Sequence, residues 1–151
     1  MGAVYFYHLT QSPLEATLPT LLEKSRGAGW RVLVRARETE RLAWLDQRLW
    51  LGEGFLPHGI SGGTHDADQP ILLASEETTS DEFQCLMVID GANVSADEVA
   101  SIERACVLFD GADQAALETA RGQWKQLTEA GVTAQYWAQE DGRWAKKAES
   151  G

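Results

Sequence analysis

Short apolar segments typical of buried strands alternate along this chain with segments of helical periodicity. The strand-like segments are residues 3–9, 30–34, 71–74, 85–89, 105–109 and 132–137, and the longer helical patterns are residues 12–26, 39–50 and 113–130. The middle strand segments are apolar at successive positions, as expected for strands covered on both faces. The pattern predicts an α/β fold with three layers, in which a mostly parallel central sheet is flanked by helices.

Several of the predicted helices have recognisable ends. Ser12 is followed three residues later by Glu15, and Ser95 by Glu98, which is the spacing of a capping box at a helix start. Gly131 closes the helical pattern of residues 113–130. The chain therefore predicts a helix after the first strand and a short helix that begins after Ser95.

The predicted fold is Rossmann-like but lacks a phosphate-binding loop. The first strand-to-helix turn, residues 8–13, contains no glycine, so a phosphate could not approach its backbone closely. No GxGxxG or GxxxxGK[ST] motif occurs, and the Gly-rich residues 59–63 carry no lysine. We therefore expect no cofactor, no metal and no catalytic residues, and a small α/β nucleotide-binding protein or enzyme of unknown substrate remains the alternative.

The length of 151 residues is that of one domain, which we expect to span residues 1–151. Residues 51–70 are rich in glycine and carry two prolines, which predicts a long loop. The segment from Ala138 onward is polar, which predicts a partly frayed tail over residues 138–151.

Charge and cysteine content restrict the class of protein. The formal charge of -10 disfavours a general nucleic-acid binder, and all 13 Lys and Arg lie outside residues 49–103. This distribution fits either chance clustering or separate acidic and basic faces. Cys85 and Cys106 lie in separate apolar runs, as buried thiols of a reducing compartment would. With no apolar run of membrane-spanning length and no signal-peptide pattern, we expect a cytoplasmic protein that binds no membrane.

Several segments together resemble the chi subunit family of bacterial DNA polymerase III. They are the aromatic first strand AVYFYHL, the strand Arg31-Val32-Leu33-Val34, Leu49-Trp50 followed by Phe55-Leu56-Pro57-His58, the Gln69-Pro70-Ile71 stretch after a Gly-rich loop, and Arg121-x-x-Trp124-Lys125. The resemblance covers nearly the whole chain. The spacing from the tryptophan to Phe-x-Pro-His is its most specific part.

The resemblance implies a non-catalytic accessory subunit of the DNA polymerase III holoenzyme, with a role in DNA replication. Members of the family pair with the psi subunit, which ties them to the clamp loader, and they bind the acidic C-terminal tail of single-stranded DNA-binding protein. In some members a helicase-like partner takes the place of psi. The resemblance therefore implies a bacterial, replisome-associated protein that meets DNA only through its partners.

One implied interaction surface is the Trp50 patch, which consists of Trp50, Phe55, Leu56, Pro57 and His58. Large apolar residues around an irregular segment favour an exposed patch, and such patches mark partner sites. We expect the Trp50 patch to bind psi or a helicase-like partner. The alternative is that these side chains fold back into the core.

The second implied surface is the tail site, which consists of Arg121, Trp124 and Lys125. Arg121 and Lys125 are one helical turn apart, and Trp124 lies beside them. An acidic peptide with a C-terminal hydrophobic residue suits two cations beside an aromatic wall, unless Trp124 belongs to the core. Better-known members carry further basic residues where this chain has Leu117 and Thr128, so we expect weaker binding unless Arg104 or Arg143 substitutes.

Overall fold

The structure is a computed structural model that describes residues 2–51, 57–62, 68–76, 78–141 and 143–150. Its strands are β1 (Ala3–Leu9), β2 (Val32–Arg35), β3 (Gly59–Ile60), β4 (Ile71–Ala74), β5 (Cys85–Val88), β6 (Arg104–Asp110), β7 (Thr133–Glu140) and β8 (Arg143–Ser150). Its helices are α1 (Leu14–Gly27), α2 (Thr39–Leu51), α3 (Ala96–Ser101) and α4 (Gln114–Glu129).

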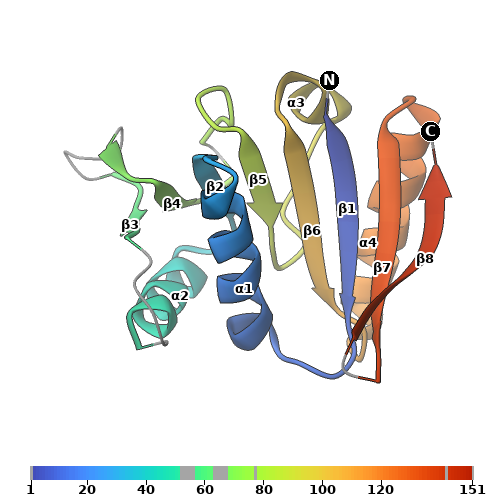
Figure 1. Ribbon diagram of the computed structural model, residues 1–151, viewed down its shortest axis with the longest axis horizontal. Helices are drawn as coiled ribbons and strands as arrows, with labels where there is room; N and C mark the ends of the chain where they lie inside the picture. The colour runs from blue at the N-terminus through green and yellow to red at the C-terminus, as the bar shows by residue number, and fades with distance from the viewer. Residues whose placement is uncertain (1, 52–56, 63–67, 77, 142, 151) are drawn as a thin grey trace.

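These strands form one mostly parallel sheet in the order β3-β4-β2-β5-β6-β1-β7-β8. β1 lies between β6 and β7 and runs parallel to both. Only the pairing of β7 with β8 is antiparallel among the described strands. The first strand of the chain thus occupies an interior position, and the C-terminal strand forms one edge (Figure 1).

Helices cover both faces of the sheet, which confirms the predicted three-layer α/β fold. On one face α1 and α2 bury Leu18, Leu22 and Leu45 against β2, β4 and β5. On the other face α3 and α4 bury Val99, Ala120 and Leu127 against β1 and β6 (Figure 1). β2, β4 and β5 are buried at all four of their positions, and apart from Arg35 at the end of β2 they consist of consecutive apolar residues.

The structure corrects one predicted helix start and confirms another. α1 does not use Ser12 as its cap: Pro13 occupies the N-cap position in an extended conformation, and no side chain bonds to the first helical turn. The Ser12 N–H instead donates to the Gln139 side chain, 3.1 Å away. The capping box of Ser95 and Glu98 is present, as predicted.

The structure also corrects the predicted C-terminal tail. β7 continues to Glu140, and β8 pairs with it along residues 143–150, so the described part of the predicted frayed segment is a hairpin. The predicted long loop is interrupted as well, because Gly59–Ile60 pairs with Leu72–Leu73 as the short strand β3. Both departures are edge strands, whose polar or short sequences carry no pattern of burial.

Candidate functional site

The Trp50 patch lies where α2 ends. Among the residues that the structure describes, Trp50 is the one large apolar side chain that is mostly exposed, at 51%. Its ring lies 4.2 Å from the His58 ring, measured between centroids, with the two planes tilted by 33°. Pro57 is half-buried, and Phe55 and Leu56 lie outside the described residues. The structure therefore brings the Trp50 and His58 rings together and leaves Trp50 accessible, whereas His58, which was expected in an exposed patch, is buried.

The buried His58 ring packs against the Trp50 ring and is itself held in place by Asp46. The His58 residue is 5% exposed, and its Nε2 lies 3.1 Å from both the backbone oxygen and the side-chain Oδ1 of Asp46. Asp46 is on α2, one turn before Trp50. This contact ties the chain after α2 back onto the helix and fixes the ring against which Trp50 lies.

α2 also presents cations beside the same end of the sheet. The guanidinium carbon of Arg41 lies 4.1 Å from the centre of the Trp44 ring, and that of Arg48 lies 5.3 Å from it. Arg41 also forms a 2.8 Å ion pair with Asp90. Such stacking holds a guanidinium over an aromatic face. This arrangement was not predicted from the sequence, although the Arg-x-x-Trp-x-x-x-Arg spacing on one helix indicates it.

The tail site lies on α4, at the opposite end of the sheet from the Trp50 patch (Figure 1). Asp113 caps this helix by accepting hydrogen bonds from the N–H groups of Ala115 and Ala116. Arg121 and Lys125 are exposed, while Trp124 is half-buried. The Trp124 ring packs edge-on against Phe6 at 5.4 Å and Tyr136 at 5.9 Å between centroids. Trp124 therefore belongs partly to the core and partly to the surface beside the two cations.

Two residues that the sequence analysis missed adjoin Arg121. The Tyr136 hydroxyl lies 2.8 Å from His8 Nδ1, so the two side chains are hydrogen-bonded across β1 and β7. Burial lowers the pKa of His8, the charge of Arg121 lowers it further, and Asp110 opposes both effects. Burial also raises the pKa of Tyr136, which Arg121 in turn lowers. The charge of Arg121 thus acts on a polar pair that extends the tail site onto the sheet.

The expected substitute Arg104 lies elsewhere. Its guanidinium carbon is 4.1 Å from the Tyr5 ring centre and 5.2 Å from that of Trp30, on the face of the sheet that carries α1 and α2. Arg104 therefore cannot replace a cation of α4. Arg143, the other expected substitute, begins β8 and lies opposite Glu140.

A cavity of about 650 Å³ lies at the carboxyl ends of β1 and β6, where α/β sheets usually bind ligands. The backbone N–H groups of its β1–α1 turn are already engaged in hydrogen bonds. The N–H groups of Thr10, Gln11 and Ser12 all donate to Gln139 Oε1, at 3.0, 2.9 and 3.1 Å. Asp113 occupies the N-terminus of α4 in the same way. Protein oxygens therefore already accept hydrogen bonds from the backbone N–H groups that an anion would need at this turn and at the start of α4.

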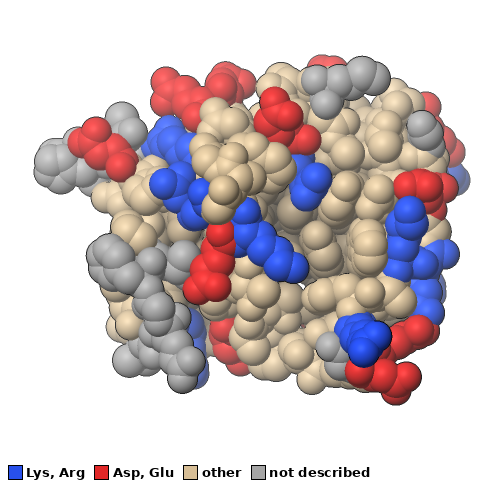
Figure 2. Space-filling view, viewed as in Figure 1, with Lys and Arg blue, Asp and Glu red and all other residues tan. Residues whose placement is uncertain are grey.

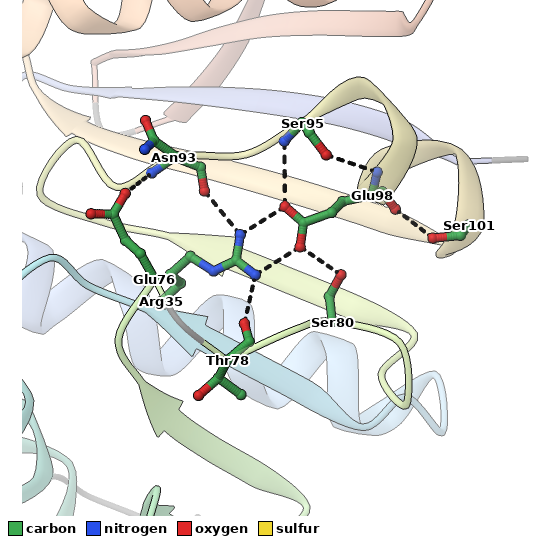
Figure 3. Close-up of polar contacts among 8 residues, drawn as sticks. All are labelled: Arg35, Glu76, Thr78, Ser80, Asn93, Ser95, Glu98 and Ser101. Atoms are coloured by element: carbon green, nitrogen blue, oxygen red, sulfur yellow. Dashed lines mark hydrogen bonds and ion pairs between the residues drawn. The ribbon is translucent and has the colours of Figure 1, made fainter.

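A buried ion pair joins β2 to α3. Arg35 Nη1 and Nη2 donate to the two carboxylate oxygens of Glu98 at 2.9 and 2.7 Å, and also to the backbone oxygens of Asn93 and Thr78 (Figure 3). Ser80 donates to the same carboxylate at 3.0 Å. Arg35, through its hydrogen bond, holds the pKa of Glu98 below its usual range. This cluster ties the β4–β5 loop and the β5–α3 loop to β2 and α3, and it lies outside both candidate sites.

Three smaller observations bear on the other function classes. Cys85 and Cys106 are free and buried, and a hydrogen bond with Cys85 together with burial raises the pKa of Cys106. Within the described ranges, no group of three His, Cys, Asp or Glu side chains is placed to hold a metal ion. No described helix is both long enough and apolar enough to cross a membrane.

Fold and geometry define a three-layer α/β domain of the open-sheet class. Solved structures that match it include S. cerevisiae Dbp5 bound to Gle1 and IP6, with a TM-score of 0.58 and 11% sequence identity. The alignment covers 93% of this chain and 42% of that chain, so the present chain spans less than half the length of Dbp5. At this identity the likeness shows the fold alone. No curated protein matches the chain.

The sequence model of the DNA polymerase III chi subunit family (HolC) matches residues 1–135. Because this match covers most of the 151 residues, the chain belongs to the DNA polymerase III chi subunit family. Its role is accordingly that of an accessory subunit in DNA replication, as the resemblance in the sequence indicated.

Proposed function

We propose that the chain is a non-catalytic adaptor in the bacterial cytoplasm that links psi, and through it the clamp loader, to single-stranded DNA-binding protein. The tail site binds the acidic C-terminal tail of single-stranded DNA-binding protein. The Trp50 patch binds psi or a helicase-like competitor. The chain then meets DNA through these proteins and needs no cofactor.

The observation that carries the proposal is the arrangement on α4. Arg121 and Lys125 are exposed and one turn apart, and the half-buried Trp124 lies beside them. An arginine can hold a terminal carboxylate in a two-point hydrogen bond while an aromatic ring packs against the last apolar side chain. Glu118 and Glu129 lie toward the two ends of the same helix, so the cations are confined to its middle.

The Trp50 patch supports a second partner by a different kind of contact. An indole that is 51% exposed and held against a buried histidine is a rigid apolar anchor. Tryptophan is the residue type most enriched among the residues that dominate binding energy in protein interfaces. Because the patch and the tail site lie at opposite ends of the sheet, one chain has room to hold both partners.

A peptide titration tests the tail site. We expect the wild-type chain to bind a fluorescent acidic peptide that ends in a phenylalanine carboxylate with micromolar affinity, weakened by salt. Arg121→Ala and Lys125→Ala each weaken binding. Lys24→Ala, which removes an exposed cation from α1, is the matched control and leaves affinity unchanged. Equal affinities for the wild type and Arg121→Ala would remove the tail site from α4.

Co-purification tests the Trp50 patch. We expect the Trp50→Ala, Phe55→Ala double variant to lose psi or the helicase-like partner while it still binds the acidic peptide. Arg121→Ala is the reciprocal control and retains that partner. Recovery of the partner at the wild-type yield with the double variant would contradict the assignment.

The alternative, a small nucleotide-binding protein or enzyme, draws support from the cavity at the carboxyl ends of β1 and β6. Against it, the backbone N–H groups there already bond to Gln139. A thermal-shift screen with nucleotides separates the two, because a ligand at about 100 times its Kd stabilises the folded state by about 2.7 kcal/mol. We expect no shift.

A further inference from the structure

The C-terminal hairpin lies beside α4 but mostly outside the part of the chain that matches the family. The family match ends at residue 135, whereas β7 continues to Glu140 and β8 runs from Arg143 to Ser150. β7 also contacts α4 through Tyr136, whose ring packs edge-on against Trp124. The hairpin therefore lies next to the tail site and mostly beyond the residues that match the family model.

The side chains of the hairpin divide between its two faces. Tyr136 and Ala138 point toward the α4 side, and their partners on β8 are Ala148 and Ala145. Directly opposed residues share a face. We call these four residues the β7–β8 ledge. Ala138 is buried, Ala145 is half-buried and Ala148 is exposed, so the part of the ledge on β8 is open to solvent.

The opposite face of the same hairpin has a different character. On that face the Trp137 ring N–H donates a hydrogen bond to the Gln135 side chain, and Lys146 lies opposite Trp137. The Trp144 ring packs edge-on against the Tyr7 ring, with 5.1 Å between centroids. In the view of Figure 2, which shows this face, a largely uncharged surface extends over β6, β1 and β7. Nothing at this aromatic face indicates which partner would cover it, whereas the ledge has charged neighbours that do.

Those neighbours make the surroundings of the ledge basic. On α4, the charge of Arg121 acts on Tyr136, and Lys125 follows Trp124, whose ring contacts Tyr136; on β8, Arg143 and Lys147 belong to the same hairpin as Ala145 and Ala148. Lys147 forms an ion pair with Glu140, which shares the α4 side with Ala138. Two cations thus surround one carboxylate on the hairpin, and two more lie on the helix. The hairpin as a whole carries three acidic and three basic side chains, so the excess of positive charge is confined to the side of the ledge that faces α4.

We propose that the β7–β8 ledge is the second half of the tail site, so that an acidic peptide lies between α4 and β8. The inference rests on the proposed function of the tail site. The last apolar side chain of the peptide packs on Ala145, Ala148 and the Tyr136 ring, and its carboxylate bonds to Arg121. Acidic residues before it lie between Lys125 and Lys147. A second copy of this chain fits poorly, because it would place the same cations against themselves.

Adjacent residues of β8 give a matched test. Lys147→Glu and Lys146→Glu change the charge equally, but Lys147 faces the α4 side and Lys146 the other side. In titrations of the full chain with the fluorescent acidic peptide at 0.15 M salt, we expect Lys147→Glu and Ala148→Glu to weaken binding about five- to tenfold. Lys146→Glu changes it less than about twofold.

The outcomes separate this inference from the proposed function. If Arg121→Ala weakens binding while Lys147→Glu and Ala148→Glu bind as the wild type does, the ledge is excluded and the tail site on α4 stands. Equal weakening by Lys146→Glu and Lys147→Glu also excludes the ledge, because it indicates a general charge effect. If Arg121→Ala binds normally, both proposals fail.

A measurement on the wild-type chain tests the same inference without any variant, in case the substituted chains do not fold. With ¹⁵N-alanine labelling, the amide signals of Ala145 and Ala148 are expected to shift when the acidic peptide is added. Ala43, exposed on α2 at the other end of the sheet, serves as the internal control. Absence of a shift at Ala145 and Ala148, with binding detected by fluorescence, would overturn the inference.

Discussion

Single side chains in this protein combine burial with charge at a few positions, and Arg35 is the clearest of them. Arg35 is 3% exposed, and Glu98 neutralises it through two hydrogen bonds. A buried cation that loses its partner is costly, because its charge stays desolvated. The two residues are 63 positions apart in the chain, so no local pattern in the sequence could have paired them.

Removal of Glu98 alone should therefore lower the free energy of unfolding more than replacement of both Arg35 and Glu98 by apolar residues. We expect Glu98→Ala to lower the free energy of unfolding by about 3 kcal/mol, and the Arg35→Met, Glu98→Leu double variant to lower it by less. Urea unfolding at pH 7 measures both values. A loss below 1 kcal/mol for Glu98→Ala would contradict this account of the cluster.

The Glu98 carboxyl also makes the stability of the folded state depend on pH. Because its pKa is lowered in the folded state, Glu98 contributes stability above the ordinary pKa of 4.5 and loses it as the pH falls through its lower folded value. This loss belongs to the acid limb of unfolding, below pH 4.5, and should be absent in Glu98→Ala.

His8 makes the stability of the folded state depend on pH in a higher range than Glu98 does. Its pKa lies below 6.5 in the folded state, so the unfolded chain takes up the proton more readily. Stability should consequently fall as the pH decreases from 7 to 5. We expect His8→Asn to show a smaller fall in melting temperature over this interval. An identical pH profile for the two proteins would exclude His8 as the source.

At the scale of elements, hydrophobic pattern predicted most of the sheet. The bounds of β1 and β4 agree with the sequence, since apolar strand residues bounded by turns are a direct signal. β8 was missed because an edge strand with four charged residues has no alternating pattern. The start of α1 was misplaced by one residue, since Pro13 takes the N-cap and the Ser12 N–H bonds to the distant Gln139.

Gln139 joins the β1–α1 turn to β7, and its removal should loosen this junction. In Gln139→Ala the N–H groups of Thr10, Gln11 and Ser12 lose a shared acceptor. We expect the free energy of unfolding to fall by about 1–2 kcal/mol, because water replaces only part of these bonds. Gln139→Glu, which keeps an acceptor oxygen, is the control and should lose less. Chemical denaturation that shows equal losses for both variants would refute this role.

At the scale of the whole molecule, the fold interleaves segments that are far apart in the sequence. The acidic middle of the chain contributes β4 and β5, which lie on either side of β2 from the basic N-terminal part. Basic and acidic groups accordingly lie next to one another on the face shown in Figure 2, and no separate acidic and basic faces are visible there. The charge distribution along the chain therefore predicted less about the surface than the motifs did.

The motifs predicted the candidate sites in part. Trp50 and His58 do meet, and Arg121, Trp124 and Lys125 do share one helix. What the sequence could not provide are the contributions of other strands, namely His8 and Tyr136 beside Arg121. Such contacts depend on strand order, which periodicity does not specify.

The separation of the two sites predicts independence. Trp50 lies on α2, near β4, whereas α4 lies over β6 and β7 at the other end of the sheet (Figure 1). Distant substitutions usually have additive effects within about 0.3–0.5 kcal/mol. Trp50→Ala should therefore change the affinity for the acidic peptide less than about twofold, measured by fluorescence polarisation. A larger change would show that the two sites communicate.

The outer margin of β8 has a further consequence for behaviour at high concentration. A free strand margin offers unpaired N–H and C=O groups, onto which another polypeptide can join as an extra strand. Here the strand is irregular near Tyr136 and Trp137 and carries Lys146 and Lys147 side by side. The irregular pairing and the two adjacent lysines both oppose edge-to-edge pairing of this strand between molecules. The outer margin of β8 is therefore unsuited to pairing with the same strand of a second molecule.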